Sequence, residues 1–316
     1  MTSFQSWTKG TITHEKFIVI SRQDGLPLDV LTVTPDAPRA ILQLSHGMCE
    51  YKERYLPFME YMAAQGCLCI IHDHRGHGKS LRREEDLGYF YHKGGPYLVK
   101  DLHQISCEIR RRYPKLPFFL FGHSMGSLAV RVYLKHYDAR LDGLIVCGSP
   151  SFHPLTAPAL SAIRLMAAVR GGRSHSALAD RMISLLDLPF LKERVRHAWI
   201  CTDRAVVDDF NADPYCNFTF TLNGYQSLLW LMKQAYDPTG WRLSKPDLPI
   251  LFMSGEKDPC LISKREFLKA IQLLRRIGYR HVTGRLFKGM RHEILNEPGK
   301  QKVFEEAAAF IHGAVS

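Results

Sequence analysis

The chain has 316 residues, 46% hydrophobic and 23% charged, a composition typical of a globular protein with a substantial core. The net charge of +11 comes from scattered basic residues without a helix-turn-helix, RNA-binding or zinc pattern, so nucleic acid is not an expected partner. The eight cysteines form no CxxC pair and no Cys/His cluster, which predicts no metal site. Without a signal peptide or an apolar stretch near the ~20 residues of a membrane span, the expected location is a reducing cytoplasm.

Strands and helices alternate along the first half of the chain. Asp24-Gly25 is a hairpin signal between the first two expected strands. Alternation of buried strands with helices predicts a mostly parallel central sheet with right-handed crossovers, flanked by helices. The expected strands are 17–20, 28–33, 40–45, 68–73, 118–121 and 143–148, and the expected helices are 55–64 and 98–113.

This alternation stops after residue 150. Residues 151–240 carry helical patterns but no convincing strand, so we expect a helical cap inserted after the sixth strand, over the C-terminal edge of the sheet. The α/β core then comprises residues 1–150 and 241–316. Cap helices are expected at 160–169, 178–186 and 225–236, and the core resumes with strands at 249–254 and 283–287 and helices at 262–277 and 303–311.

The stretch Gly122-His123-Ser124-Met125-Gly126 lies between the apolar strand 118–121 and a helical segment. In this context Gly-X-Ser-X-Gly is typical of a nucleophile elbow, a turn so tight that glycine is needed on both sides of the serine. The turn holds the hydroxyl above the sheet, and the following helix directs its positive end at any charge formed there. Because a serine hydroxyl is a poor nucleophile, the prediction requires a base and an acid elsewhere in the chain.

Two side chains at the carboxyl ends of later strands fit these roles. Asp258 follows the strand 249–254 and His292 follows the strand 283–287, which gives the chain order serine, acid, histidine. The imidazole of His292 would take the proton of Ser124 during attack on an acyl carbon, and the carboxylate of Asp258 would orient the imidazole. The sequence therefore predicts a triad of Ser124, Asp258 and His292.

The negative charge that develops on the carbonyl oxygen requires two backbone N–H donors. Our candidates are Met125, the residue after the nucleophile, and Met48, in the loop after the strand 40–45. Other ionisable residues near strand ends are less favoured: Glu256 and Asp73 as alternative acids, and His74, His77 and His123 as structural or supporting residues.

Five stretches resemble the monoacylglycerol lipase and lysophospholipase group of α/β-hydrolases, and the resemblance covers roughly residues 15–150 and 245–312. It implies an α/β-hydrolase fold and a serine hydrolase that acts, without a cofactor and through an acyl-enzyme, on monoacylglycerols, lysophospholipids or other carboxylic esters. Glu50 and Arg54 match family positions near the site, where they would either contact substrate or form a structural ion pair. The five stretches are HGMCEYKERY at 46–55, DHRGHGKS at 73–80, GHSMG at 122–126, GEKD at 255–258 and HEILNE at 292–297.

Two other functions stay open. The same triad and fold also cleave amides, which would make the protein a peptidase or amidase. A non-catalytic ligand-binding homologue is the second alternative, although all three triad positions hold competent residues. The expected partner is a small-molecule acyl ester, whose chain the apolar cap would suit, and the basic surface favours transient contact of the cap with a membrane. The oligomeric state is not predicted.

Overall fold

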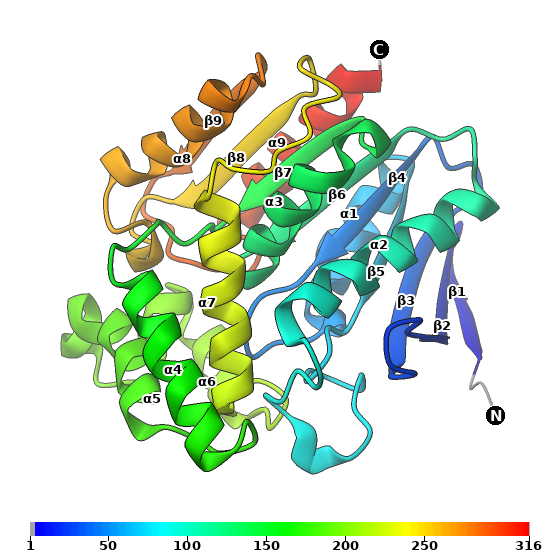
Figure 1. The fold of residues 1–316 in the computed structure, drawn as a ribbon. Coiled ribbons are helices and arrows are strands. Elements are labelled where there is room, and N and C mark those ends of the chain that lie inside the picture. The colour runs from blue at the N-terminus through cyan, green and yellow to red at the C-terminus, as the bar shows by residue number, and fades with distance from the viewer. Residues whose placement is uncertain (1–3, 316) are drawn as a thin grey trace.

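A nine-stranded sheet organises the fold, as Figure 1 shows. The computed structural model describes residues 4–315. The strands β1, β2, β3 and β5 pair antiparallel, and from β5 onward the neighbours pair parallel, as the alternation of strands and helices predicted. In sheet order the strands are β1 (Gln5–Lys9), β2 (Ile12–Ile20), β3 (Pro27–Pro35), β5 (Cys67–His72), β4 (Ala40–Ser45), β6 (Phe118–His123), β7 (Gly143–Cys147), β8 (Ile250–Gly255) and β9 (Val282–Phe287).

The central strands are buried on both faces, and their side chains alternate between two core layers. In β6, Phe118 and Leu120 pack in the layer covered by α2, α3 and α8, whereas Phe119 and Phe121 pack in the layer covered by α1 and α9. This period of two is that of an extended strand between two helical layers, and it explains why such strands are continuous apolar runs in the sequence. The helices outside the segment between β7 and β8 are α1 (Leu56–Ala64), α2 (Gly94–Arg112), α3 (Met125–Tyr137), α8 (Lys264–Ile277) and α9 (Lys300–Val315).

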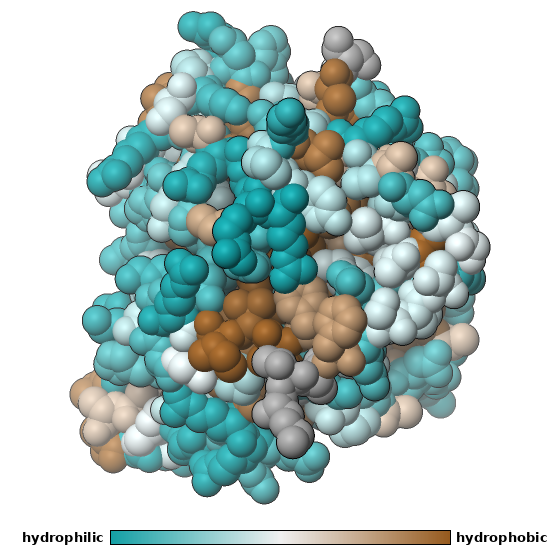
Figure 2. Space-filling model, turned by 90° about the vertical axis from the view of Figure 1, so that its right-hand side faces the viewer, coloured by the Kyte–Doolittle hydropathy of each residue, from teal (hydrophilic) through white to brown (hydrophobic). Residues whose placement is uncertain are grey.

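The N-terminal edge of the sheet differs from the sequence prediction. Strand β1 pairs antiparallel with β2 and is exposed along its whole length, so it has no alternation of apolar and polar residues that would predict it. Because of this extra strand, the helical insertion follows the seventh strand and not the sixth. Figure 2 shows the face at this edge, which is mostly hydrophilic with apolar residues gathered near its centre.

Between β7 and β8 the chain forms helices, short 3-10 turns and an isolated bridge between His175 and Thr221. These helices gather at one end of the sheet, and α7 leads back to the core by packing on α2 and α3 (Figure 1). Among residues 4–315, no helix combines the length and the apolarity needed to cross a membrane. The helices of this segment are α4 (Thr156–Arg170), α5 (Ala177–Ser184), α6 (Arg204–Ala212), which the sequence did not predict, and α7 (Leu222–Tyr236).

Candidate active site

Ser124 lies in a strained turn between β6 and α3. Its φ of 52° and ψ of −119° lie outside the regions that side-chain-bearing residues normally adopt. The glycines on either side permit close packing: a Cβ on Gly126 would lie 2.0 Å from the Ser45 carbonyl oxygen, and one on Gly122 would lie 2.4 Å from the Gly126 carbonyl oxygen. The backbone therefore has the geometry of a nucleophile elbow, with serine at the position of strain.

His292 and Asp258 form a buried hydrogen-bonded pair. Nδ1 of His292 lies 2.9 Å from Oδ2 of Asp258, and the same oxygen accepts a hydrogen bond of 3.0 Å from the Ser254 hydroxyl. The other carboxylate oxygen accepts the backbone N–H of Cys260 at 2.8 Å. An acceptor on the Nδ1 side holds the neutral imidazole with its proton on Nδ1, which leaves Nε2 free to accept a proton. His292 lines the same cavity as Ser124.

The two alternative acids lie elsewhere. Glu256 is paired with Lys264 at the surface. Asp73 is buried and forms an ion pair with Lys52, whose Nζ lies 2.9 Å from Oδ2 of Asp73. Only Asp258, of the three carboxylates considered, is hydrogen-bonded to His292 among the described residues.

The loop after β4 lies directly against the nucleophile. A Cβ on Gly47 would lie 2.5 Å from Oε1 of Glu50 and 3.0 Å from the Cβ of Ser124, so a side chain there would displace Glu50. Met48 and Met125 both line the cavity, and neither backbone N–H donates to another residue within 4–315. The predicted oxyanion donors thus border the same cavity as Ser124, with backbone N–H groups that have no partner among the described residues.

Glu50 is a buried carboxylate that supports this loop. Its Oε1 accepts hydrogen bonds from the backbone N–H of Gly47 at 2.5 Å and from the hydroxyl of Tyr55 at 2.9 Å. Its Oε2 accepts one from Arg54 at 3.1 Å, and the Arg54 guanidinium also binds both carboxylate oxygens of Glu293 at 2.8 and 2.7 Å. Both of the predicted residues Glu50 and Arg54 thus belong to an ion-pair network, and Glu50 also borders the cavity.

His123 connects this network to His292. Its Nδ1 lies 3.1 Å from Oε1 of Glu50 and its Nε2 lies 3.2 Å from the backbone carbonyl oxygen of His292. Both partners are acceptors, an arrangement that favours the imidazolium, in which both ring nitrogens donate. Burial alone would lower the pKa of His123, but the hydrogen bond and the charge of Glu50 outweigh burial and raise it. Burial would raise the pKa of the Glu50 carboxyl, but the hydrogen bond and the charge of His123, together with the charge of Arg54, hold it well below its usual range.

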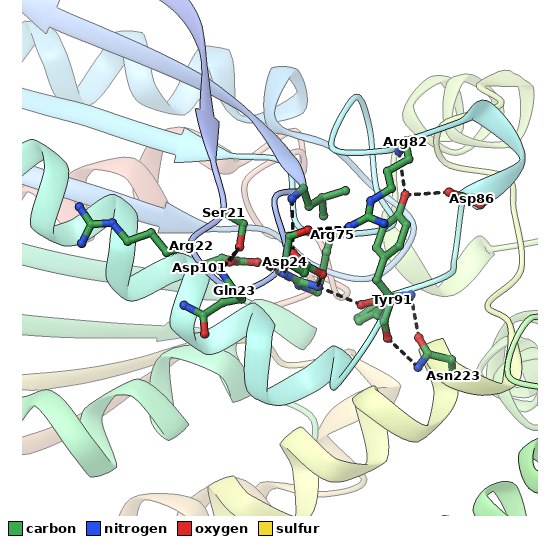
Figure 3. A network of polar contacts seen from close by, with 12 residues as sticks. Ser21, Arg22, Gln23, Asp24, Arg75, Arg82, Asp86, Tyr91, Asp101 and Asn223 are labelled. Atoms are coloured by element: carbon green, nitrogen blue, oxygen red, sulfur yellow. Dashed lines mark hydrogen bonds and ion pairs between the residues drawn. The ribbon is translucent and has the colours of Figure 1, made fainter.

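The DHRGHGKS stretch serves the scaffold and does not face the cavity. The buried guanidinium of Arg75 binds Asp101 at 2.6 Å and Asp24 at 3.0 Å, which ties the loop after β5 to α2 and to the β2–β3 hairpin (Figure 3). Asn223 on α7 accepts the N–H of Phe90 and donates to the carbonyl oxygen of Tyr91, so this loop also holds the helical segment (Figure 3). Burial lowers the pKa of both His74 and His77, which are therefore neutral structural residues.

A cavity of about 370 Å³ opens in front of Ser124, and its lining is predominantly apolar. The segment between β7 and β8 contributes much of the wall, including Ile183, Leu228 and Met232. Asp258, Cys260 and His292 also offer ligand atoms within 4.8 Å of one another. Because Asp258 and His292 are already bonded to each other, and Asp258 accepts two further donors, this group fits an acid–base pair better than a metal site.

Some residues of the site carry no sequence signal. Trp199 packs its ring against the His292 ring, with centroids 4.8 Å apart. Ser254 donates a hydrogen bond to the buried carboxylate of Asp258. Only the position of Ser254 at the end of a strand could have suggested it, because serine and aromatic residues are common in buried segments.

Comparisons with known proteins identify the family to which the chain belongs. The family described as serine aminopeptidase, S33 (Hydrolase_4) matches residues 36–299. A monoacylglycerol lipase of Mycolicibacterium smegmatis is 25% identical over 283 residues, 88% of this chain and 90% of that protein. Phospholipase YtpA of Bacillus subtilis is 27% identical over 277 residues, 87% of this chain and 96% of that protein. A thermostable carboxyl esterase from Bacillus coagulans has a similar structure, with a TM-score of 0.89 and 26% identity over 96% of this chain and 99% of the esterase. Since the family match spans most of its length, the chain belongs to the Hydrolase_4 (S33) family, in the monoacylglycerol lipase-like group of α/β-hydrolases.

Proposed function

We propose that this chain is a serine hydrolase of carboxylic esters that works through an acyl-enzyme, with Ser124 as nucleophile, His292 as base and Asp258 as the acid that orients the base. One arrangement carries the proposal: Ser124 in its strained turn and His292, which is hydrogen-bonded to Asp258, border one cavity. Met48 and Met125 line the same cavity, and within the described residues their backbone N–H groups have no partner. Related proteins named as lipase, phospholipase and esterase support the choice of an ester.

The geometry supports a two-step reaction. Ser124 Oγ attacks the acyl carbon while Nε2 of His292 takes its proton, and the carbonyl electrons move onto oxygen, which the N–H groups of Met48 and Met125 receive. When the intermediate collapses, the ester C–O bond breaks and His292 gives the proton to the departing alkoxide. Water, deprotonated by His292, then attacks the acyl-enzyme, releasing the carboxylic acid and restoring Ser124. Asp258 stabilises the imidazolium in both steps.

We propose monoacylglycerols, lysophospholipids or similar acyl esters as substrates. The apolar cavity supports this choice, because burial of each methylene of an acyl chain contributes ~0.8 kcal/mol. In this proposal residues 151–240 form a cap domain on a core of 1–150 and 241–316, and the cap selects the substrate. Leu165 and Val169 on α4 and Leu178 on α5 are exposed, which supports transient contact of the cap with a membrane surface. All eight cysteines are free, which supports a reducing cytoplasm.

A panel of p-nitrophenyl esters from C2 to C12 tests the proposal. We expect kcat/KM to rise with chain length, and Ser124→Ala to reduce turnover at least ~10³-fold. A fluorophosphonate probe should label wild type at Ser124. Full turnover by Ser124→Ala would refute the mechanism, and flat or falling efficiency from C2 to C12 would refute the acyl-chain site.

An amide substrate is the second candidate, because the matching family is described by an aminopeptidase. A p-nitroanilide of the acyl group that gives the fastest ester decides between the two. We expect the ester to be cleaved faster. Faster cleavage of the anilide would assign the protein to the amidases with the same triad.

A further inference from the structure

The residue before His292 is tied to the segment between β7 and β8. The guanidinium of Arg291 donates from Nη1 to the carbonyl oxygens of Ala198 at 2.5 Å and Cys201 at 3.1 Å. It also forms an ion pair with Glu193 and stacks 4.1 Å from the ring of Phe190. Its side chain is only 10% exposed. The hydrogen bonds, the ion pair and the ring contact of this guanidinium therefore all join it to residues 190–201 of the helical segment.

The backbone continues this attachment through His292 itself. The N–H of His292 lies 3.4 Å from the carbonyl oxygen of Trp199, and the N–H of Glu293 donates to the carbonyl oxygen of Ile200 at 2.7 Å. The Trp199 ring also packs on the His292 ring. Residues 291–293 and 198–201 thus lie alongside each other, and one side of the proposed base is built by the cap segment.

Glu297 closes the same attachment from the core side. One of its carboxylate oxygens accepts the N–H of Arg291 at 2.8 Å and the N–H of Thr202 at 3.1 Å. The other accepts the Thr202 hydroxyl. The loop that carries His292 and the segment 190–202 are therefore joined at both backbone and side-chain level.

We propose that Arg291 is a positioning residue, which holds the imidazole of His292 in place by clamping its loop to residues 190–201. This inference rests on the hydrolase function proposed above. Asp258 fixes only Nδ1 of the imidazole, so the ring plane and the direction of Nε2 also depend on the backbone of His292 and on Trp199. Loss of Arg291 would leave the carbonyl oxygens of Ala198 and Cys201 and the Glu193 carboxylate without this donor, and the loop would be free to shift.

A second attachment of the cap provides a matched control. Arg173, which follows α4, pairs with Asp86 and stacks 4.1 Å from the Tyr89 ring. Asp86 and Tyr91 belong to the core loop drawn in Figure 3. Within residues 4–315, Arg173 has no hydrogen bond, ion pair or ring contact with residues 291–293, so Arg173→Ala removes one arginine clamp of the cap without touching the loop of His292.

Steady-state kinetics with p-nitrophenyl butyrate separate positioning from simple anchoring. A misplacement near 1 Å costs on the order of 10²-fold, so Arg291→Ala should lower kcat about 30- to 100-fold while KM changes less than about 2-fold. Arg291→Lys keeps the charge and should recover most of this loss. Arg173→Ala should keep kcat within about 2-fold of wild type, because Nε2 of His292 stays in place.

Hydrogen exchange of the Glu293 amide provides a structural readout. Its protection reports the bond to Ile200, and Arg291→Ala should accelerate its exchange about 10-fold or more, whereas Arg173→Ala should not. Glu193→Gln weakens the clamp at its exposed end and serves if Arg291→Ala does not fold. For Glu193→Gln we expect a lower kcat at unchanged KM and faster exchange of the Glu293 amide.

Three results would overturn the proposal: equal kcat losses in Arg291→Ala and Arg173→Ala, a change in KM alone, or unchanged kcat in Arg291→Ala and Glu193→Gln with unchanged exchange of the Glu293 amide. Failure of the hydrolase function gives a different pattern, since wild type would then cleave no ester. Wild-type turnover that depends on Ser124, together with normal turnover in Arg291→Ala, would remove the positioning role alone.

Discussion

Glu50→Gln tests whether the ionised pair of Glu50 and His123 holds the loop after β4 in place. Oε1 of Glu50 faces three donors, the N–H of Gly47, the hydroxyl of Tyr55 and Nδ1 of His123. Oε2 faces the Arg54 guanidinium. A glutamine offers one oxygen and one NH2 group, so whichever way the amide turns, a donor faces a donor.

The structure sets the expected size of this effect. The side chains of Glu50 and His123 are only 4% and 5% exposed, so solvent does not screen their interaction. Removal of one partner from a buried pair typically costs ~3–5 kcal/mol, and we expect Glu50→Gln to lower the free energy of unfolding by about that amount. Glu53→Gln is the matched control, because Glu53 is 22% exposed and its partner Lys52 keeps Asp73 and Asp29. The control should cost about 1 kcal/mol or less.

The cost of Glu50→Gln should depend on pH with a defined sign. The folded-state pKa of His123 is raised above 6.5. The stabilisation that its positive charge adds to the folded state is therefore complete below pH 6.5 and is lost as the pH rises through the folded-state pKa. The lowered pKa of Glu50 makes the contribution of the carboxylate complete above about pH 4.5, its unfolded value. Urea unfolding followed by tryptophan fluorescence from pH 5.5 to 9.5 should therefore give the largest cost at the acidic end. A cost below about 1 kcal/mol, or one that grows with pH, would refute the imidazolium assignment.

Two further substitutions test the packing around the site. In Gly126→Ala the new methyl group would lie 2.0 Å from the Ser45 carbonyl oxygen. We therefore expect loss of fluorophosphonate labelling and a melting temperature at least about 10 °C lower. Gly313→Ala is the control and should match wild type, because the new methyl group would meet no atom within 4 Å. Burial lowers the pKa of His72 to about 3, so the unfolded chain binds its proton first and stability falls as the pH drops below about 6.5. His72→Leu should reduce the slope of unfolding free energy against pH between 6 and 4 by about 1.4 kcal/mol per unit, and an unchanged slope in urea titrations would contradict the buried neutral ring.

Local patterns in the sequence predicted the core strands because each is an uninterrupted apolar run between helical segments. The run 118–121 lies within β6, and the run 143–148 includes all of β7. The exposed strand β1 was missed because it buries no residue, and α6 was missed because it is only nine residues long and buries only Val207 and Phe210. Pairing with β2, a tertiary contact, fixes β1 in the sheet.

In the candidate site, too, some residues could be predicted from the sequence and others could not. Ser124, Asp258 and His292 could be predicted because fold topology places strand ends together and dictates their order along the chain. The contact between Asp258 and His292 spans 34 residues, and the sequence order alone suggested it. Glu50 stayed ambiguous between substrate contact and ion pair, because its partner His123 lies far away in the chain and no local pattern indicates which donors surround a buried carboxylate.

The attachment of the His292 loop to residues 190–202 gives the proposed cap a second role in the proposed mechanism. A cap that only covered a finished triad could vary freely in sequence and position without affecting the chemical step. Here the backbone of His292 and Glu293 faces Trp199 and Ile200, so in the proposed mechanism substrate enclosure and the orientation of the base depend on the same segment. A substitution in this segment that alters the cavity is therefore expected to change kcat as well as KM, whereas one at the exposed end of α4 is expected to change neither on a short ester.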